Sequence, residues 1–441
     1  MASSKAEGGV LGKLAGVVAD IRKLPADLLL IYANVSLYAL CYQMQAPVQP
    51  ELVKSLGADK DMFSNLKSYF SFLQLIGSLI SGPLIDTYGA KRVFLLNFVA
   101  CVLCYGITAM STSMTGLYIS FLPTLFQHGV LAARAYISCT SPDKDIARRT
   151  GYVGLAYGLG FVVGPSLGGA LTSWDLRAAA WIATAGSLLS VVLVAWLLPG
   201  GTEPKAGAQR AQAAEDSDGN ESGLLAKAVE AGRVLASNPT VQFVLALKLL
   251  FGCAMALLYS AFSLYLTDTF DLSPAQYGGI MSFAGVVGMV SQAVLVKEAQ
   301  ANLDGFQVTA GCGLLLGVGL LGFAFSGTWM HVCLVMVPIT VASTVLSNIS
   351  SAQLVSAVEE GRGAIVAVDM GLGSAVRIVS PKAAKWLVAT AGFPAVGMVA
   401  AGLTGGMVAL AFSGASRLAA LLSSTPAVAD APPSKGKAKA E

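Results

Sequence analysis

The sequence Gly-Pro-Leu-Ile-Asp-Thr-Tyr-Gly-Ala-Lys-Arg occupies Gly82–Arg92 and separates two apolar runs, Phe70–Ile80 and Val93–Met110. The chain of 441 residues is 55% hydrophobic and only 12% charged, whereas a soluble domain is about 25% charged. Because so apolar a chain cannot keep a water-facing surface, most of its exterior must face lipid. The stretch is therefore a polar turn between two membrane-length helices.

Five residues give this turn its character. Gly82 and Gly89 permit a tight reversal, because glycine adopts backbone conformations that other residues avoid. Lys91 and Arg92 mark a cytoplasmic loop, and Asp86 ends a helix where it can meet a helix N-terminus or a base. The pattern Gly-x-Leu-x-Asp-x-x-Gly-x-Lys-Arg resembles the cytoplasmic signature of the major facilitator superfamily of transporters. In that family it implies a latch for one conformation.

The apolar stretches predict the fold class. A membrane-spanning helix needs about 20 apolar residues, and twelve stretches meet this length. The sequence therefore predicts an all-α multi-pass membrane protein with twelve transmembrane helices in two six-helix bundles, the major facilitator fold. The predicted spans are 27–47, 63–85, 93–111, 116–138, 152–172, 178–198, 241–265, 275–296, 308–325, 330–351, 364–388 and 395–412.

The distribution of basic residues orients these spans. With the N-terminus inside, the outside loops hold only Lys54, Lys60 and Arg177, and all other loop and terminal lysines and arginines lie inside. Since positive residues accumulate in cytoplasmic loops, both termini are predicted to be cytoplasmic. The membrane is either the plasma membrane or that of an organelle.

The chain divides into five predicted segments. A cytoplasmic N-terminal segment over 1–26 precedes an N-terminal six-helix bundle over 27–198. A cytoplasmic linker over 199–240, ending in an amphipathic piece, leads to a C-terminal six-helix bundle over 241–412. The tail over 413–441, rich in Ala, Pro and Lys, is expected to be disordered.

Short internal matches support a duplicated architecture. Ser71-Phe72 followed by Gly77 in span 2 recurs as Ser282-Phe283 followed by Gly288 in span 8. Pro165 in span 5 corresponds to Pro381 in span 11. Repeats of this kind are common in secondary transporters.

Span 5 contains a glycine motif made of Gly160, Gly164, Pro165, Gly168 and Gly169. Glycines at this spacing create a flat helix face that another helix can approach closely, and the proline bends the helix by removing one hydrogen bond. The motif resembles the span-5 signature of drug–proton antiporters. Plain helix packing is the alternative interpretation.

Span 4 departs from that antiporter pattern. The arginine expected there, which the resemblance links to proton coupling, is replaced by Phe121. This replacement argues against proton antiport. His128 lies near the middle of the span and could titrate near neutral pH, or it could be a hydrogen-bonded packing residue.

Other ionisable residues also fall inside predicted spans, where charges are costly and usually functional. Lys67 is expected to extend toward the outer surface. Arg377 is expected to face a central cavity. Lys248 and Asp369 lie at similar depth and could pair, or Lys248 could extend to the surface while Asp369 caps its helix.

Polar residues at helical spacing indicate which faces line the cavity. Tyrosines among them suit an organic ligand, because each offers a ring face and a hydroxyl. The candidate residues for the substrate or proton cavity are Asn34, Tyr38, Tyr42, His128, Lys248, Tyr259, Asp369 and Arg377.

No sequence pattern indicates an enzyme or a cofactor. The chain lacks the phosphate-binding pattern Gly-x-x-x-x-Gly-Lys-Ser/Thr, so ATP is not the expected energy source. The seven cysteines show no metal-binding arrangement and no disulfide framework. The small net charge of +3 does not suggest nucleic-acid binding.

Over residues 27–412 the chain is most similar to the organic cation transporter-like members of solute carrier family 22, in the drug/proton antiporter-like branch. Leu73–Gly77, Met281-Ser282-Phe283, Lys248, and Arg377 with Pro381 carry this resemblance. It implies a monomeric secondary active transporter that moves a small drug-like solute or organic cation by alternating access with proton-coupled antiport. Two alternatives stay open: a uniporter or exchanger of an organic anion or metabolite, and a transport-inactive membrane receptor or scaffold.

Overall fold

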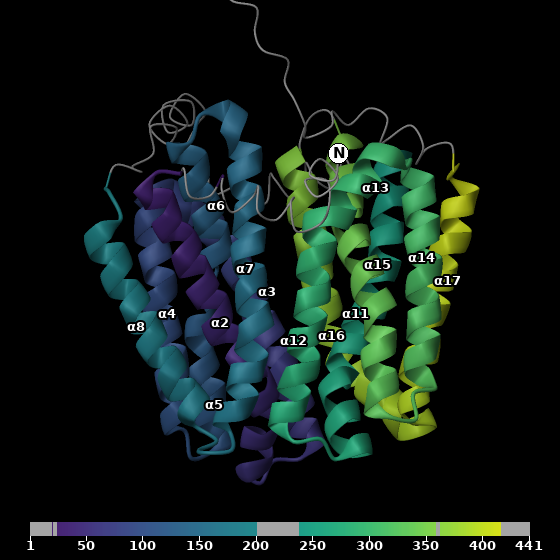
Figure 1. The fold of residues 1–441 in the computed structure, drawn as a ribbon, viewed down its shortest axis with the longest axis horizontal. Coiled ribbons are helices and arrows are strands. Elements are labelled where there is room, and N and C mark those ends of the chain that lie inside the picture. Colours follow the sequence, from purple (N-terminus) through teal and green to yellow (C-terminus); the bar gives the residue numbers. More distant parts are fainter. Residues whose placement is uncertain (1–19, 21–23, 201–237, 359–361, 416–441) are drawn as a thin grey trace, which may run out of the picture.

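The computed structural model describes residue 20 and residues 24–200, 238–358 and 362–415. Within these residues the protein is all-helical, and the helices form two bundles that stand side by side (Figure 1). The ends of the helices define two faces of the molecule. The terminal face, at the top of Figure 1, holds Ala26, Leu197, Pro239 and Ser413, and the opposite face holds the other ends of the same helices.

The N-terminal bundle consists of long helices joined by short connections. Its elements are α2 (Ala26–Ser55), α3 (Lys60–Tyr88), α4 (Ala90–Met110), α5 (Met114–Phe121), the 3₁₀ turn η1 (Leu122–Phe126), α6 (Gly129–Thr140), α7 (Asp143–Leu171) and α8 (Ala178–Leu197).

The C-terminal bundle repeats this pattern with a different irregularity, a π-helical turn in its second helix. Its elements are α11 (Pro239–Phe270), α12 (Pro274–Val290), the π turn η2 (Ser291–Leu295), α13 (Val296–Asn302), α14 (Gly305–Ala324), α15 (Trp329–Ser356), α16 (Arg362–Ala391) and α17 (Phe393–Ser413). The predicted amphipathic piece of the linker lies outside the described residues.

Local chemistry accounts for several helix starts. Ser273 and Gln276 form a reciprocal capping box at the start of α12, with Pro274 in the first turn. Asp304 and Gln307 do the same for α14. Such caps satisfy backbone N–H groups that have no partner inside the helix. The connections at these two points are therefore specified by the residues themselves.

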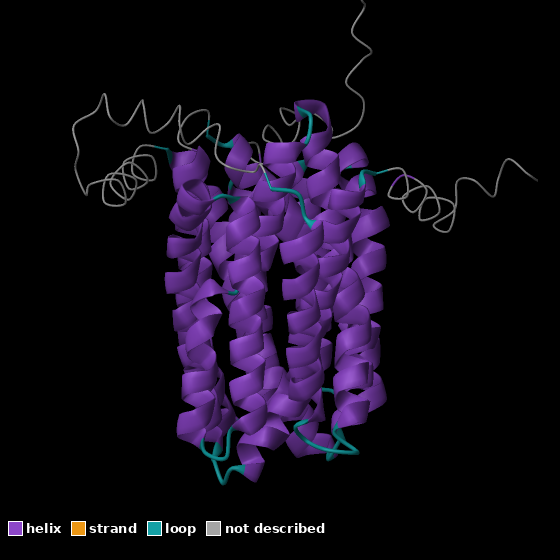
Figure 2. Ribbon diagram, turned by 90° about the vertical axis from the view of Figure 1, so that its left-hand side faces the viewer, coloured by secondary structure: helices purple, strands orange, loops and turns teal. Residues whose placement is uncertain are grey.

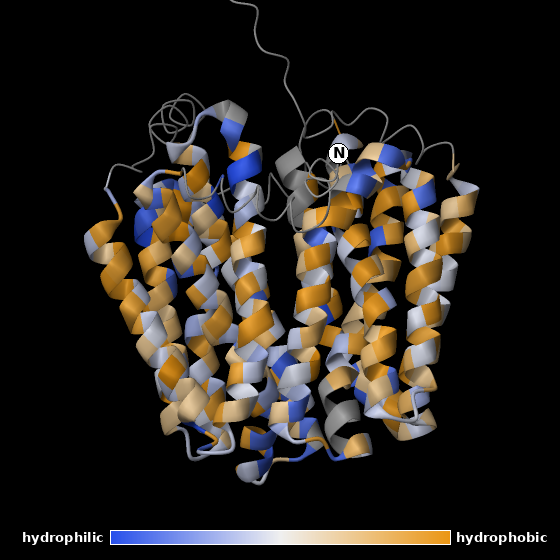
Figure 3. Cartoon of the chain, viewed as in Figure 1, coloured by the Kyte–Doolittle hydropathy of each residue, from blue (hydrophilic) through white to orange (hydrophobic). Residues whose placement is uncertain are grey.

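Nine of the described helices are long and apolar enough to cross a membrane. Figure 3 shows apolar residues spread over the outside of both bundles, and Figure 2 shows the long helices running nearly parallel. The three other predicted spans correspond to α2, α16 and the interrupted stretch α5–η1–α6. Polar side chains lower the hydropathy of α2 and α16, and the interruption shortens the third. Of the twelve predicted spans, nine are therefore clear within the described residues, and the other three are polar or broken.

The break in span 4 corrects a prediction. A continuous helix was expected over 116–138, but α5 ends at Phe121 and α6 begins only at Gly129. Pro123 begins the 3₁₀ turn between them. Because proline has no N–H and clashes with the preceding turn, it disfavours a continuous α-helix here.

The turn between α3 and α4 is also simpler than predicted. Only Gly89 has the left-handed backbone, with φ of 83°, and it alone separates the two helices. Gly82 is inside α3, and a methyl group added there would meet no atom within 4 Å. The reversal therefore needs one glycine and not two.

Two interfaces join the bundles. The first, called here the glycine seam, is α7 against α12: Gly278 lies against the Pro165 carbonyl and Gly169 against that of Pro274. At the same seam Ser166 Oγ donates to Ser282 Oγ at 2.7 Å. In the second interface, α3 packs on α16, and Lys385 forms an ion pair with Asp61.

The Ser166–Ser282 hydrogen bonds, the Asp61–Lys385 ion pair and the glycine contacts of α7 with α12 lie between mid-helix and the opposite face. The structure therefore represents a state in which the bundles are joined on the side of the opposite face.

Candidate functional site

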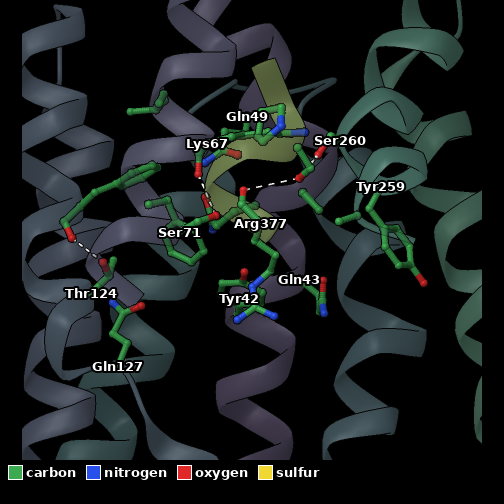
Figure 4. Close-up of a pocket in the computed structure, with 18 of the residues that line it drawn as sticks. Tyr42, Gln43, Gln49, Lys67, Ser71, Thr124, Gln127, Tyr259, Ser260 and Arg377 are labelled. Carbon is green, nitrogen blue, oxygen red and sulfur yellow. Dashed lines mark hydrogen bonds between the residues drawn. The ribbon is translucent and has the colours of Figure 1, made fainter. Parts of the chain in front are cut away.

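A cavity of about 600 Å³ lies between the two bundles (Figure 4). The N-terminal bundle contributes side chains from α2, α3, α4 and the α5–η1 region, and the C-terminal bundle contributes α11 and α16. Its size falls in the range of pockets that hold drug-sized ligands. Because both bundles line it, a change in their relative position changes access to it.

The cavity has a cationic character. Arg377 on α16 and Lys67 on α3 line it, and its described lining includes no aspartate or glutamate. Arg377 Nη2 donates to Ser374 Oγ at 2.9 Å, one turn earlier on the same helix. Its side chain extends toward Tyr42 across the pocket (Figure 4). The guanidinium is thus held by one neutral hydroxyl and presents its other donors to the cavity.

The position of Lys67 differs from the prediction. It was predicted to extend to the outer surface, but it lies among the cavity residues. Its Nζ stands 4.6 Å from the centroid of the Phe63 ring, a cation–π arrangement. The aromatic contact helps to hold this ammonium group within the protein.

Aromatic rings form an apolar wall of the cavity. Phe70 stacks on Tyr42 with ring centroids 6.3 Å apart and meets Phe121 edge-on at 5.6 Å. Tyr259 on α11 is 54% exposed and lines the same space. Phe121, which occupies the position of the expected arginine, thus contributes an aromatic surface in place of a charge.

Four amides line the cavity; Gln45 belongs to the polar stripe predicted for span 1, whereas Gln43, Gln49 and Gln127 were missed from the sequence. Gln45 Nε2 also donates to the Ala179 carbonyl at 3.2 Å, which ties α2 to α8. The signal for Gln49 was present, because Gln45 and Gln49 follow Tyr42 at helical spacing on one face of α2.

Of the eight predicted cavity residues, Tyr42, Tyr259 and Arg377 line the cavity. Asn34 does not: it is 1% exposed, and its Nδ2 donates to the Leu30 carbonyl at 2.8 Å. Tyr38 also lies outside the lining, and its hydroxyl donates to the Gln127 carbonyl at 3.1 Å. The polar stripe of α2 therefore serves the interior of the bundle at one end and the cavity at the other.

Lys248 and Asp369 form an ion pair inside the C-terminal bundle, as their similar depth suggested. Lys248 Nζ lies 2.5 Å from Asp369 Oδ2 and 3.0 Å from Ser351 Oγ. The two side chains are 15% and 23% exposed. Neither lines the cavity. This pair joins α11, α15 and α16 at a level nearer the terminal face than the cavity.

The predicted latch residues separate into different environments. Asp86 is exposed and, within the described residues, makes no ion pair or hydrogen bond. Lys91 donates to the Leu198 carbonyl at 2.5 Å and to Ala195 at 3.4 Å, so it caps the end of α8 within its own bundle. Arg92 is exposed.

The span-5 glycine motif packs against two helices. Gly160, Gly164 and Gly168 lie directly on α2, near the backbone of Ala39–Leu40 and Met44. Gly169 and the carbonyl of Pro165 instead face α12 in the glycine seam. One helix therefore uses small residues both inside its bundle and between the bundles.

These features define a class: a helical membrane protein in which two bundles enclose a central cavity between them. The sequence profile described as "Major Facilitator Superfamily" matches residues 31–381. The chain belongs to the major facilitator superfamily, and the resemblance inferred from Gly82–Arg92 is confirmed.

Individual relatives agree with this assignment. Human "Solute carrier family 67 member A1" is 27% identical over 84% of this chain and 88% of its own length. Mouse "Solute carrier family 22 member 18" is 26% identical over 84% of this chain and 92% of its own. The "Tetracycline resistance protein, class C" of Escherichia coli is 26% identical over 69% of this chain and 75% of its own.

Solved structures share the fold. The crystal structure of the human organic anion transporter MFSD10 (TETRAN) aligns with a TM-score of 0.61 at 19% identity, covering 88% of this chain and all of that one. A peptide transporter POT in complex with alafosfalin aligns with a TM-score of 0.68 at 16% identity, covering 90% and 96%. At these identities the likeness concerns the fold alone.

Proposed function

We propose that this protein carries a small, amphipathic organic anion across a membrane by alternating access. The charge of the cavity is the observation that carries this proposal: Arg377 and Lys67 line it without an acidic residue among its described lining. Two cations in a partly apolar space attract an anion and repel a cation, since local dielectric shielding is weak there. The aromatic wall of Phe70, Phe121 and Tyr259 would hold the apolar part of the solute.

The cavity charge weighs against the organic cation suggested by the family resemblance. Drug-like cations generally need an acid or a cage of aromatic faces around the positive group, and a guanidinium at the centre opposes them. The human organic anion transporter MFSD10 shares this fold, so the fold is compatible with transport of an anion. Coupling to protons in antiport is part of the proposal and follows from the resemblance to drug efflux relatives.

The observed conformation corresponds to one of the two end states of the proposed alternating-access cycle. We place the terminal face in the cytoplasm, as the basic residues suggest. The glycine seam and the α3–α16 interface then close the outer side, and the structure is inward-facing. The outward-facing state would then join the bundles on the terminal side. Asp86, which makes no ion pair within the described part of the chain, and the end of α3 are available for that contact.

The proposal is tested by solute charge. Purified protein in liposomes is loaded with unlabelled solute, and counterflow of labelled solute is compared among matched series of aromatic carboxylates, the corresponding neutral amides and the corresponding amines. Carboxylates should exchange, and amines of the same shape should not. Exchange of the amines in preference to the carboxylates would reverse the proposed charge, and no exchange in any series would favour a receptor or scaffold.

A further inference from the structure

Side-chain hydrogen bonds tie the break in span 4 to three other helices. Gln74 Nε2 on α3 donates to the Thr124 carbonyl at 3.0 Å, and the Tyr38 hydroxyl on α2 donates to that of Gln127. Gln127 Nε2 in turn donates to the Ala100 carbonyl on α4 at 3.3 Å. Interrupted backbone within a membrane is tolerated only where the protein satisfies its polar groups. This break is therefore a built feature of the N-terminal bundle.

His128 ends the break, and its ring is directed at α3. Its Nε2 is buried and has no hydrogen-bond partner. A methyl group added at Gly77 of α3 would lie 2.5 Å from this nitrogen and would overlap the Leu125 carbonyl oxygen. The imidazole nitrogen and the carbonyl thus share the small space that the missing side chain of Gly77 leaves.

A second polar side chain without a partner adjoins the same break. Asn97 on α4 is 0% exposed, and both its Nδ2 and its Oδ1 lack a hydrogen bond. Its amide lies against Gly129, the first residue of α6, which has no side-chain cap. Buried polar atoms without partners are rare and costly, so two such residues around one break mark a place where a proton or a hydrogen bond changes during function.

Among the described residues, no fixed charge adjoins His128. The titratable groups brought near the break are Tyr38 on α2, Cys101 and Cys104 on α4, and Tyr157 on α7, which pairs with Tyr38. On α3 the facing residues Gln74 and Gly77 do not titrate, and Lys67 is about three turns away. Along α6 the nearest charge is Arg134, nearly two turns beyond His128. Among these groups the imidazole is the one whose unperturbed pKa lies nearest to neutral pH.

We propose that His128 binds a proton on Nε2 and releases it during the transport cycle, and this proposal rests on the transport function proposed above. Binding a proton creates an N–H that needs an acceptor, and Nε2 has no hydrogen-bond partner in the state described here. The proton comes from water on one side of the membrane and returns to water on the other, and no other bond changes. The state described here, with Nε2 buried against Gly77 and without a partner, is the neutral one, and protonation favours a different packing of α3 on the break.

The link to transport runs through α3. This helix carries Gly77 against the break, Asp61 in the ion pair with Lys385, and Asp86 at its other end. A shift of α3 relative to α16 would also shift Gly77 relative to His128. Because the two events share one helix, the protonation state of His128 biases the position of the bundles, and the bundles bias its affinity for protons.

The chain offers a direct spectroscopic test, because it contains only two histidines. His331 is exposed near the start of α15, so the variant His331→Gln leaves His128 as the sole histidine. Nuclear magnetic resonance of its ring nitrogens, in nanodiscs with ¹⁵N-labelled histidine, should show a transition from neutral to cationic imidazole as the pH is lowered. A transported solute should move that transition. A ring that keeps one neutral tautomer throughout would overturn the proposal.

Transport gives the second readout. In liposomes the unsubstituted protein should accumulate solute in response to a pH gradient, with a limit of about tenfold per pH unit for one coupled proton. His128→Gln should lose this response, and His331→Gln should keep it. Counterflow, which requires no proton movement, separates the two proposals. Absence of counterflow in the unsubstituted protein contradicts transport itself, whereas counterflow with a pH response that survives in His128→Gln contradicts only the role of His128.

Discussion

At the scale of the single residue, Arg377 carries the strongest prediction. Arg377→Gln should reduce counterflow of an organic carboxylate by at least about tenfold, because a lost charge-assisted hydrogen bond is worth roughly 1.5–3 kcal/mol. Arg377→Lys should retain part of the activity, since lysine keeps the charge but not the planar fork. Lys382→Gln, which removes an exposed charge from the same helix outside the cavity, is the matched control. Equal rates in all three variants would remove Arg377 from the site.

A second residue-scale prediction concerns Lys248 and Asp369. Lys248→Asp and Asp369→Lys should each impair transport, because each places two like charges within about 3 Å of one another in a partly buried site. The double swap should recover part of the loss. Initial uptake rates at equal protein content measure this. If the double variant is no better than the worse single one, the pair does not act as a unit.

The sequence predicted the site only in part, and the residues explain why. Arg377 could be found because an arginine within a span demands a cavity or a partner. Asn34 was misplaced because a polar stripe in lipid fits a cavity and an interhelical contact equally well. Lys67 was misplaced because depth along a helix does not give the direction in which a long side chain bends. Direction depends on neighbours such as Phe63, and these come from the tertiary fold.

At the scale of the helix, the glycines of α7 and α3 make a matched pair. Gly168→Ala should destabilise the protein by about 1–3 kcal/mol, because its methyl group would overlap the Met44 carbonyl of α2. Gly82→Ala should be neutral or stabilising by about 1 kcal/mol, since nothing lies within 4 Å and alanine favours a helix. Unfolding temperature in detergent is the measurement. Equal shifts for the two variants would contradict the packing described for the glycine motif.

Helix existence was predictable, but helix continuity was not. Average hydropathy over a window counts α5, the 3₁₀ turn and α6 as one apolar stretch, because it ignores the order of residues within the window. Pro123, His128 and Gly129 were visible signals of a break, yet proline and glycine also occur in unbroken membrane helices. The outcome depends on Gln74 and Tyr38, which supply hydrogen bonds from other helices.

At the scale of the whole molecule, Asp86 is expected to act only in the outward-facing conformation. Asp86→Ala should leave insertion and folding unchanged, because the carboxylate has no partner among the described residues of the inward-facing structure. Transport should slow, since a lost contact in one conformation shifts a balance of a few kcal/mol between two. Initial uptake at equal surface expression tests this, with the adjacent Thr87→Ala as control. Unchanged uptake would argue against the latch.

A cross-link across the glycine seam should stop the cycle. The hydroxyl oxygens of Ser166 and Ser282 are 2.7 Å apart, so cysteines at both positions should form a disulfide under oxidation. The oxidised double variant should bind solute but not exchange it, and reduction should restore exchange. Each single cysteine variant is the control. Full exchange in the oxidised, cross-linked protein would show that the bundles need not part at this seam.

The glycine seam and the α3–α16 interface are held together by different kinds of interaction. At the glycine seam backbone meets backbone, so re-forming it freezes few side-chain rotamers and involves no ionic charge. The α3–α16 interface includes the ion pair of Lys385 and Asp61, whose side chains are 39% and 54% exposed. Salt screens exposed charges, with a Debye length of about 8 Å at 0.15 M and about 3 Å at 1 M, but leaves contacts between uncharged surfaces nearly unchanged. Rising ionic strength should therefore loosen the molecule on one side only, with α7 and α12 serving as the hinge about which it opens.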